Sequence, residues 1–236
     1  MHTSSIIILT RNEIAGVRRL ITSIPVNKVT ECFAVDYNST DGTVEFFRDH
    51  HIRVIRQKKP GRGEAFRIGA AAAKGDYLIF FSPDGNEDPA DITKLLKLLD
   101  LGFDMAVASR FMNGSMNEED TQRLKPRAWA NRAFTFCANV IFAGHVTDSI
   151  NGYRAITKDA FSRLRLDADG FAIEYQMTIR ALKLHMRIAD IPTHESPRIG
   201  GQSTAIAIPT GLLVLRVLLR EIWLALLEGI EPSSNP

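Results

Sequence analysis

Side chains that could hold a divalent cation lie in the segment Ser82–Pro89, which directly follows an apolar run. Asp84 and Asn86 are close neighbours in this short segment, so their oxygens could contact the same ion. Carboxylate and amide oxygens are ligands that Mg²⁺ or Mn²⁺ takes, often together with substrate phosphates. An ordinary Asp-Gly turn would also explain Asp84 and Gly85, so the metal hypothesis depends on the other polar clusters.

Two more polar clusters follow apolar runs earlier in the chain. Thr10-Arg-Asn-Glu13 comes after the first run, and Asp36 begins the polar segment after the second. Turn and helix-cap chemistry explains Ser39–Thr43, but it does not explain Asp36, which directly follows apolar residues. We therefore expect Asp36 to belong to a binding site.

The segment Gly61-Arg-Gly63 suits contact with a phosphate group. Small residues at the start of a helix let the backbone approach a phosphate, and Arg62 would supply a counter-charge. The run Gly61–Gly69 resembles a dinucleotide-binding fingerprint only superficially, because Phe66 takes the place of its third glycine. We therefore do not expect NAD as a ligand.

These clusters fall at the ends of predicted strands. Short apolar runs alternate with helical patterns, which is typical of βαβ units and a mostly parallel sheet. The predicted strands are Ser5–Leu9, Glu31–Val35, Ile52–Ile55, Tyr77–Phe81 and Met105–Ala108. The predicted helices are Ala15–Ile24, Thr43–His50, Gly63–Lys74 and Asp91–Leu99. Ligands bind beyond the carboxyl ends of the strands in such sheets, so the polar clusters should meet at one edge.

The second half of the chain is predicted to be mainly helical. We expect helices at Trp129–Phe142 and Glu174–Leu184, with the aromatic residues of the first packed in the core. A short strand near Arg187–Ile191 comes before the glycine-containing loop Arg198–Ser203.

A Leu-rich helix is expected at Thr210–Glu228, interrupted by charges and too short to span a membrane. Arg216 and Arg220 lie one turn apart on it. Two interpretations stay open at this point. The helix could pack on the domain or on a second subunit, or it could lie in a membrane interface, a depth that suits Trp223.

Composition bounds the class of protein. The 236 residues are 45% hydrophobic and 24% charged, which is enough for a substantial core. The net charge is only +2 and the basic residues are scattered, so we expect no nucleic-acid partner. Cys32 and Cys137 have neither metal-ligand nor redox spacing, and we expect buried reduced thiols. The start of the chain lacks the pattern of a signal peptide, so we expect a cytoplasmic location.

Seven motifs together resemble the family 2 glycosyltransferases of the GT-A fold. The motifs are Thr10–Glu13, Val35–Thr43, Gly61–Ala65, Gly75–Tyr77 with Ser82–Asn86, Ser109–Phe111, Asp148 with Gly152–Arg154, and Arg198–Ser203. Their order, over about residues 4–205, is most similar to dolichol-phosphate mannose synthase and its polyprenyl-phosphate relatives. The resemblance implies an α/β fold of GT-A type, with a Rossmann-like, mostly parallel sheet flanked by helices and followed by an amphipathic helix.

The resemblance also implies a donor site for a nucleotide diphospho-sugar. The implied contacts are Thr10, Asn12, Glu13, Asp36, Tyr37, Arg62, Gly63, Ser82 and Asp84. Asp36 matches the first acid of the family's nucleotide-binding motif, whereas Tyr37 replaces the second acid and could stack on the base. Ser82 replaces the first acid of the Asp-x-Asp metal motif. Asp84 and Asn86 match its remaining ligands for Mg²⁺ or Mn²⁺.

The acceptor phosphate is assigned by the same resemblance to Arg110, Arg127, Arg198 and Ser203. Asp148 matches an acid between the two substrates and joins Asp84, Arg110 and Arg198 as a catalytic candidate. A lipid phosphate is already anionic and needs no general base, only arginines that position it. A sugar hydroxyl would need a carboxylate base, for which Asp148 or Glu174 are candidates. Glu174 could equally be a solvated helix position.

The leading hypothesis is an inverting, metal-dependent glycosyltransferase that acts on a polyprenyl phosphate at the cytoplasmic membrane face. Transfer to a saccharide hydroxyl is the alternative activity. A non-catalytic sugar-nucleotide-binding adaptor is a third possibility, because Tyr37 and Ser82 depart from the family pattern. We expect residues 1–205 to form the GT-A domain, 206–229 a helix for a membrane interface or an oligomer, and 230–236 a disordered tail. The loop Phe111–Leu124 is expected to close over the acceptor.

Overall fold

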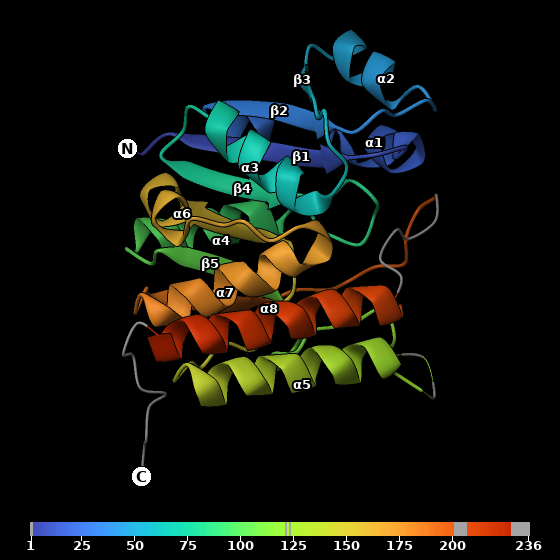
Figure 1. The fold of residues 1–236 in the computed structure, drawn as a ribbon. Coiled ribbons are helices and arrows are strands. Elements are labelled where there is room, and N and C mark those ends of the chain that lie inside the picture. Colours follow the sequence, from blue (N-terminus) through green and yellow to red (C-terminus); the bar gives the residue numbers. More distant parts are fainter. Residues whose placement is uncertain (1, 121, 123, 201–206, 228–236) are drawn as a thin grey trace.

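Seven strands form one sheet in this computed structural model, which describes residues 2–120, 122, 124–200 and 207–227 (Figure 1). The strands are β1 (Ser4–Thr10), β2 (Glu31–Asp36), β3 (Arg53–Arg56), β4 (Tyr77–Phe81), β5 (Met105–Ser109), β6 (Arg154–Thr157) and β7 (Ile188–Pro192). Their order across the sheet is β3-β2-β1-β4-β6-β5-β7. Only the pairings of β6 with β4 and β5 are antiparallel among these strands. The expected α/β fold with a mostly parallel sheet is confirmed.

Helices cover both faces of the sheet (Figure 1). One face carries α3 (Arg62–Ala72), α6 (Lys158–Leu164) and α7 (Ile173–Lys183). The other carries α1 (Ile14–Leu20), α2 (Thr43–Asp49) and α4 (Asp91–Asp100), and short 3₁₀ turns lie at Val26–Lys28 and Gly170–Ala172. Successive side chains of a strand point to opposite faces, so Ile7 packs with the first group and Ile8 with the second.

The strand β6 and the helix α6 were not indicated by the sequence patterns. β6 has four residues and begins with Arg154, whose side chain is fully buried. Arg154 donates hydrogen bonds to the carbonyl oxygens of Asn151 at 2.8 Å and Glu174 at 3.1 Å. Burial lowers the pKa of Arg154 to about 10. Strands are predicted from runs of apolar residues, and a charged residue in a strand of only four residues interrupts that run. This is why the sequence did not indicate β6.

The helix α5 (Pro126–Ile141) begins earlier than expected, with proline in its first turn. Its aromatic residues do not all lie in the core: Trp129 is 55% exposed and Phe136 is 67% exposed. Phe134 and Phe142 are partly buried against the cluster that α5 shares with α7 and α8 (Ala207–Leu227). The expected core stripe is therefore wrong for Trp129 and Phe136, because α5 packs through one face only.

The two cysteines are free thiols, and both are partly buried rather than fully buried as expected. Cys32 lies at the edge of the core under α1 and α2. Burial raises the pKa of Cys32 to about 12, so its reactive thiolate form is scarce near neutral pH.

The inner face of α8 packs on α5 and α7 (Figure 1). Its buried apolar residues are Val214, Val217, Leu218 and Ala225. No helix in the described part of the chain is long and apolar enough to cross a membrane.

The buried acid Glu221 fastens α8 to α7. Glu221 is fully buried and accepts hydrogen bonds from Arg180 Nε at 2.8 Å and Gln176 Nε2 at 3.1 Å. Lys183 Nζ lies 3.6 Å from the other carboxylate oxygen. The charge of Glu221 therefore belongs to the packed face of α8, not to a solvated one.

We expect Glu221→Ala to lower the free energy of unfolding by about 3 kcal/mol, because Arg180 and Lys183 would lose a buried counter-charge. Urea denaturation followed by circular dichroism measures this change. The control is Asp159→Ala, which breaks an exposed pair with Arg163 at 3.7 Å and should cost less than about 1 kcal/mol. Equal losses in the two variants would contradict the role given to Glu221.

Candidate active site

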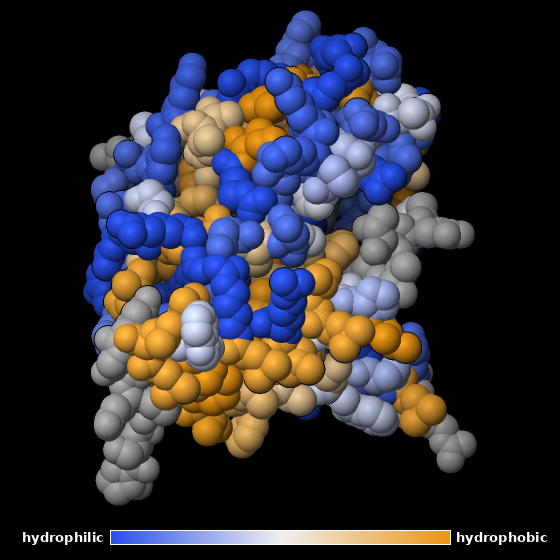
Figure 2. All heavy atoms as spheres, in the orientation of Figure 1, coloured by the Kyte–Doolittle hydropathy of each residue, from blue (hydrophilic) through white to orange (hydrophobic). Residues whose placement is uncertain are grey.

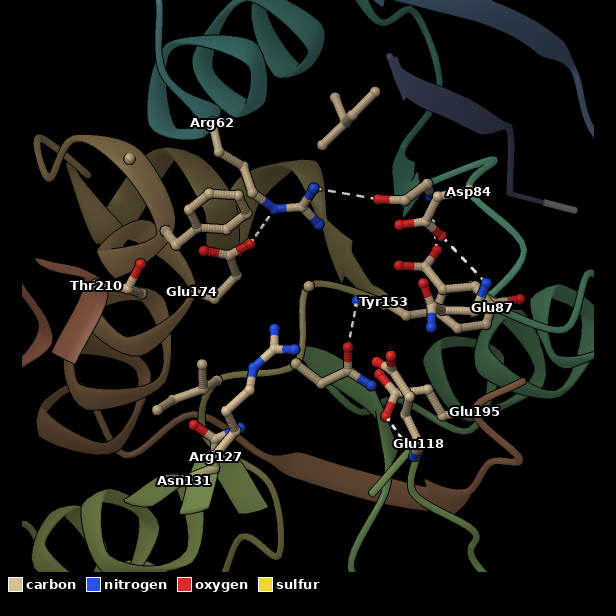
Figure 3. Close-up of a pocket in the computed structure, with 18 of the residues that line it drawn as sticks. Arg62, Asp84, Glu87, Glu118, Arg127, Asn131, Tyr153, Glu174, Glu195 and Thr210 are labelled. Atoms are coloured by element: carbon tan, nitrogen blue, oxygen red, sulfur yellow. Dashed lines mark hydrogen bonds and ion pairs between the residues drawn. The ribbon is translucent and has the colours of Figure 1, made fainter. Parts of the chain in front are cut away.

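A pocket of about 500 Å³ opens at the carboxyl ends of the strands and extends to α5 and α8. Residues that follow β1, β2, β4 and β5 line it, so the polar clusters do meet at one edge of the sheet. Figure 3 shows Arg62, Asp84 and Glu87 toward one end of the pocket, with Arg127 and Asn131 toward the other.

The pocket gathers most of the residues predicted from the sequence. Those that line it are Thr10, Glu13, Tyr37, Arg62, Ser82, Asp84, Asn86, Arg110, Arg127 and Arg198. Four described residues predicted for the site do not line it, namely Asn12, Asp36, Gly63 and Asp148. Ser203 and the predicted tail, 230–236, lie outside the described residues.

Asp36 and Asn12 shape the loops beside the pocket. The buried Asp36 carboxylate accepts hydrogen bonds from the backbone N–H of Ser39, at 3.0 Å, and from its hydroxyl. Asn12 receives the N–H of Thr40 at 2.8 Å, and its own N–H donates to Ser39 Oγ at 2.8 Å. These contacts hold the turn after β2 against the turn after β1, next to Tyr37.

Tyr37 and Gly63 were both predicted to contact the donor, but only Tyr37 lines the pocket. Tyr37 lines the pocket, and the Arg11 guanidinium lies 5.2 Å from the centre of its ring. Gly63 packs against the carbonyl of Ala168, where a Cβ atom would collide. Tyr37 is thus available to a ligand, whereas Gly63 allows a close approach of two segments.

The Asp84 carboxylate has two partners from its own chain. Its Oδ1 accepts the N–H of Asn86 at 3.1 Å, and its Oδ2 accepts Arg198 Nη1 at 2.9 Å. Arg198 Nη2 also donates to Glu13. Burial raises the pKa of Glu13 to about 7, with Arg198 opposing and Asp84 adding to the shift. One guanidinium therefore bridges two pocket carboxylates.

The surroundings of Asp84 fit a divalent cation that is held partly by ligand phosphates. The Arg198 guanidinium already occupies a cationic position between Asp84 and Glu13. Asn86 lines the pocket, while its side-chain amide nitrogen donates to Ser196 O at 2.8 Å. The described residues hold no group of three or more His, Cys, Asp or Glu side chains suited to a metal. Mg²⁺ often takes one or two carboxylates and completes its shell with phosphates and water.

Arg62 crosses the pocket from the start of α3 (Figure 3). Its Nε donates to Glu174, and its Nη1 donates to Ser82 Oγ at 3.1 Å. Glu174 is only 2% exposed, so its interpretation as a solvated helix position is wrong. The second carboxylate oxygen of Glu174 finds no hydrogen-bond partner among the described residues, an unfavourable state for a buried oxygen. A ligand hydroxyl would satisfy it.

Glu87 is a pocket residue that the sequence analysis did not single out. Its Oε2 accepts the N–H of Ser82 at 2.7 Å, and it lies beside Asp84 in Figure 3. Burial raises its pKa well above the usual value, and the charge of Asp84 adds to this. Glu87 thus brings a carboxylate to the place where Ser82 lacks one. The acidic run at 84–88 is visible in the sequence, but only the fold shows which members face the pocket.

Arg110 and Asp148 form a buried pair with two contacts. Arg110 Nε lies 2.7 Å from Asp148 Oδ2, and Arg110 Nη2 lies 3.1 Å from Oδ1. Burial acts to raise the pKa of Asp148, but Arg110 lowers it below the usual value. Backbone N–H groups of Ile150 and Asn151 also donate to Asp148. Asp148 is therefore placed to position Arg110 rather than to take a proton from a ligand.

Carboxylates also border the end of the pocket near Arg110. Glu195 Oε1 lies 3.7 Å from Arg110 Nη1, and Glu195 Oε2 accepts the N–H of Glu118 at 3.0 Å. Burial raises the pKa of Glu195, while Arg110 opposes the shift. Neither acid was predicted as a site residue, but Glu118 belongs to the loop expected to close over the acceptor, and Glu195 follows β7, where the strand-end rule could have found it.

The loop predicted as a lid, Phe111–Leu124, contributes Glu118 to the lining of the pocket among its described residues. The N–H of Met116 donates to Thr193 O at 3.0 Å, which joins the loop to the segment after β7. Glu119 accepts the N–H of Ala128 at 2.9 Å and so joins it to the first turn of α5.

The three arginines predicted to hold an acceptor phosphate are not gathered at one point. Arg198 contacts Asp84, and Arg110 contacts Asp148. Arg127 lies on α5 beside Asn131 (Figure 3). Of the three, Arg127 is the one without an ion pair to any described residue.

Comparison with known proteins identifies relatives of this chain. Residues 5–165 match the sequence model of Glycosyl transferase family 2. Glycosyltransferase AglJ of Haloferax volcanii is 31% identical over 199 residues, which are 83% of this chain and 63% of that protein. The undecaprenyl-phosphate mannosyltransferase of Micrococcus luteus is 29% identical over 214 residues, which are 84% of this chain and 85% of that protein.

The chain is shorter than some of these relatives. A low-salt glycan biosynthesis hexosyltransferase of Haloferax volcanii is 25% identical over 92% of this chain but only 53% of its own length. The chain thus spans between half and two thirds of the two Haloferax relatives. The glucosyl-3-phosphoglycerate synthase of Mycobacterium tuberculosis shares the fold, with a TM-score of 0.76 and 23% identity over 99% of this chain and 82% of that one. Because the family model covers well over half of the sequence, the chain belongs to glycosyl transferase family 2.

Proposed function

We propose that this glycosyltransferase moves a sugar from a nucleotide diphospho-sugar to a polyprenyl phosphate, with inversion, at the cytoplasmic face of a membrane. The observation that supports this proposal most strongly is where the two ends of the pocket lie. It runs from Asp84 at the strand ends to Thr210 and Gly211 on α8, beside an exposed apolar surface. A polar donor and an apolar acceptor can therefore reach the same pocket from different ends.

The half of the pocket around Asp84 suits the donor. Arg62, at the start of α3, would contact the diphosphate, and the Tyr37 ring offers a stacking surface for the base. The mycobacterial synthase has been solved with Mn²⁺, UDP-glucose and phosphoglyceric acid, and with Mg²⁺ and UDP. We propose Mg²⁺ or Mn²⁺ here as well, held by Asp84 with Asn86 beside it. Such a cation neutralises the diphosphate as it leaves.

Glu174 suits the donor sugar. Glu174 lines the pocket, Arg62 holds one of its carboxylate oxygens in place, and the other oxygen is buried without a hydrogen-bond partner among the described residues. A sugar hydroxyl that donates to this oxygen would satisfy a buried acceptor and orient the ring. Gly152 lies directly against this pair, because a Cβ atom there would collide with Arg62.

The opposite half suits an acceptor that is already anionic. Arg127 faces the pocket from α5, and Asp148 holds Arg110 at its wall. A phosphate oxygen would attack the anomeric carbon from the side opposite the diphosphate, so the new carbon–oxygen bond forms as the old one breaks. No proton has to be removed from such an acceptor, which agrees with the engagement of Asp148 by Arg110.

Exposed apolar side chains gather over α8 and α5, at the bottom of Figure 2. They are Ile208, Leu212, Leu215, Leu219, Trp223, Leu226 and Leu227 on α8, with Trp129, Phe136 and Val140 on α5. We call them the α5–α8 apolar face. A large apolar surface marks an interaction site, and Trp and Leu with nearby basic residues are typical of helices in a lipid interface. We propose that this face rests on the membrane as a peripheral contact. Pairing of two copies through α8 is the competing use.

A saccharide hydroxyl is the second candidate acceptor. Glu195 and Glu118 border the pocket near Arg110, and the raised pKa of Glu195, which burial causes, suits a general base. A saccharide hydroxyl needs this general base, whereas a lipid phosphate does not.

Transfer to lipid is the direct test. With Mn²⁺ and radiolabelled UDP- or GDP-sugars, we expect label in the organic phase only when undecaprenyl or dolichyl phosphate is supplied. Asp84→Asn should lower the rate about a hundredfold or more, because the diphosphate would leave without its cation. Thin-layer chromatography of the extract measures both results. Label on a free saccharide would favour the second candidate, and donor binding without turnover would favour a non-catalytic adaptor.

The apolar face gives a separate prediction. Leu219 and Trp223 are 58% and 60% exposed, so replacing both with Gln should leave the core intact. We expect about tenfold weaker sedimentation with anionic vesicles, because apolar surface that the membrane would bury is lost. Leu101→Gln, at another exposed leucine, is the control and should not change binding. Unchanged vesicle binding with loss of a dimer in light scattering would assign the face to oligomerisation.

A further inference from the structure

The segment 196–200, which we call the strap, lies over the loop that carries Asp84. The backbone N–H of Ser196 donates to Asn86 O at 3.2 Å, and that of Ile199 donates to Asp84 O at 2.8 Å. The side chain of Asn86 donates back to Ser196 O at 2.8 Å. The strap and the proposed metal loop are therefore joined along their backbones.

Side-chain packing adds to these bonds. Ile199 lies directly on Gly85, where a Cβ atom would collide with it. Gly85 has φ of +101°, a conformation that favours glycine. The strap thus closes on the loop through both hydrogen bonds and apolar contact.

Arg198 places its guanidinium at the centre of this contact. Its Nη1 lies 2.9 Å from Asp84 Oδ2, its Nη2 donates to Glu13, and its Nε donates to Gly200 O at 2.8 Å. Asp84 Oδ1 is already bonded to the N–H of Asn86. Both oxygens of the carboxylate therefore have partners within the chain.

The carboxylates around the strap favour a cation at the position of Arg198. Glu13, Asp84 and Glu87 lie on this side of the pocket, and Arg198 pairs with the first two. Arg62 is held by Glu174 toward the same end of the pocket, where its charge also acts on Asp84 and Glu87. Without Arg198, Glu13 and Asp84 would lose their paired cation, and the repulsion between these carboxylates would increase where water is partly excluded.

We propose that Arg198 competes with the divalent cation for Asp84, so that the strap stays closed only while the site lacks metal and donor. Arg198 would leave Asp84 as the cation arrives, because two cations repel at one carboxylate oxygen. The strap then loses its charged anchor, and the released guanidinium becomes available to the acceptor phosphate. Only this last step, the contact with the acceptor phosphate, rests on the proposed function. The competition between Arg198 and the cation does not depend on which acceptor the enzyme uses.

The test is a Mn²⁺ titration of the full chain, in which electron paramagnetic resonance measures free Mn²⁺, alone and with UDP or GDP. We expect Arg198→Gln to bind Mn²⁺ about fivefold more tightly than the wild type, because a competing ion pair is removed. Ile199→Ala keeps every charge and weakens only the strap, so it should shift the affinity in the same direction by less. Arg163→Gln, an exposed arginine on α6, is the matched control and should not change the affinity.

Hydrogen exchange gives an independent readout of the strap. The amides of Ser196 and Ile199 should exchange faster when Mn²⁺ with UDP or GDP binds the wild type, whereas ordinary ligand contact would slow them. In Arg198→Gln these amides should exchange fast before any ligand is added. If this variant does not fold, Ile199→Ala and exchange in the wild type still decide the matter.

Three results would overturn the inference: equal or weaker Mn²⁺ affinity in Arg198→Gln, no Mn²⁺ binding by either protein, or slower exchange of the strap on ligand binding. The proposed function fails separately. Suppose that Arg198→Gln binds Mn²⁺ more tightly but the wild type transfers no sugar to a lipid phosphate. The competition between Arg198 and the cation would then stand, and only the proposed lipid acceptor would be wrong.

Discussion

Charge pairing inside a partly buried pocket is the constraint on which this structure depends. A charged side chain that leaves water needs a partner, and the inner arginines of the pocket have one. Arg62 holds Glu174, Arg110 holds Asp148, and Arg198 holds Asp84. Each pair joins segments far apart in the sequence, so the pairs fix the walls of the pocket as well as its charge. A substrate that carries phosphates and a cation therefore enters a site whose inner arginines are already paired with carboxylates, and its phosphates must compete for these arginines.

The sequence was a good guide to the elements and to the edge of the sheet where they meet. Alternating apolar runs located β1 to β5, a strand-end polar cluster located Asp84, and the family resemblance added Tyr37. It was a poor guide to contacts made across long separations. The Asp36 carboxylate bonds to Ser39 in its own loop and does not line the pocket. Glu174 is buried and pairs with Arg62. No local pattern reports such pairs, since each depends on how two distant segments pack.

The reversed strand β6 explains why residues before it belong to the site. A strand that runs against its neighbours starts where they end, so β6 begins at the edge where β4 and β5 finish. The segment that leads into it brings Asn151, Gly152 and Tyr153 to the pocket. In a wholly parallel sheet the same residues would lie at the opposite edge. The buried charge of Arg154 then secures the start of this strand through Asn151 and Glu174.

The burial of Glu221 has a geometric consequence for the proposed contact between α8 and a membrane. An acid held by Arg180 and Gln176 fixes how α8 is rotated about its axis and how far it is shifted along it. The outward leucines of α8 and the opening of the pocket are then parts of one rigid body. If that outward side rests on lipid, the packing of α8 fixes the height of Asp84 above the headgroups. If the acceptor is the proposed polyprenyl phosphate, only a short stretch of its chain would then have to leave the bilayer, whatever its total length.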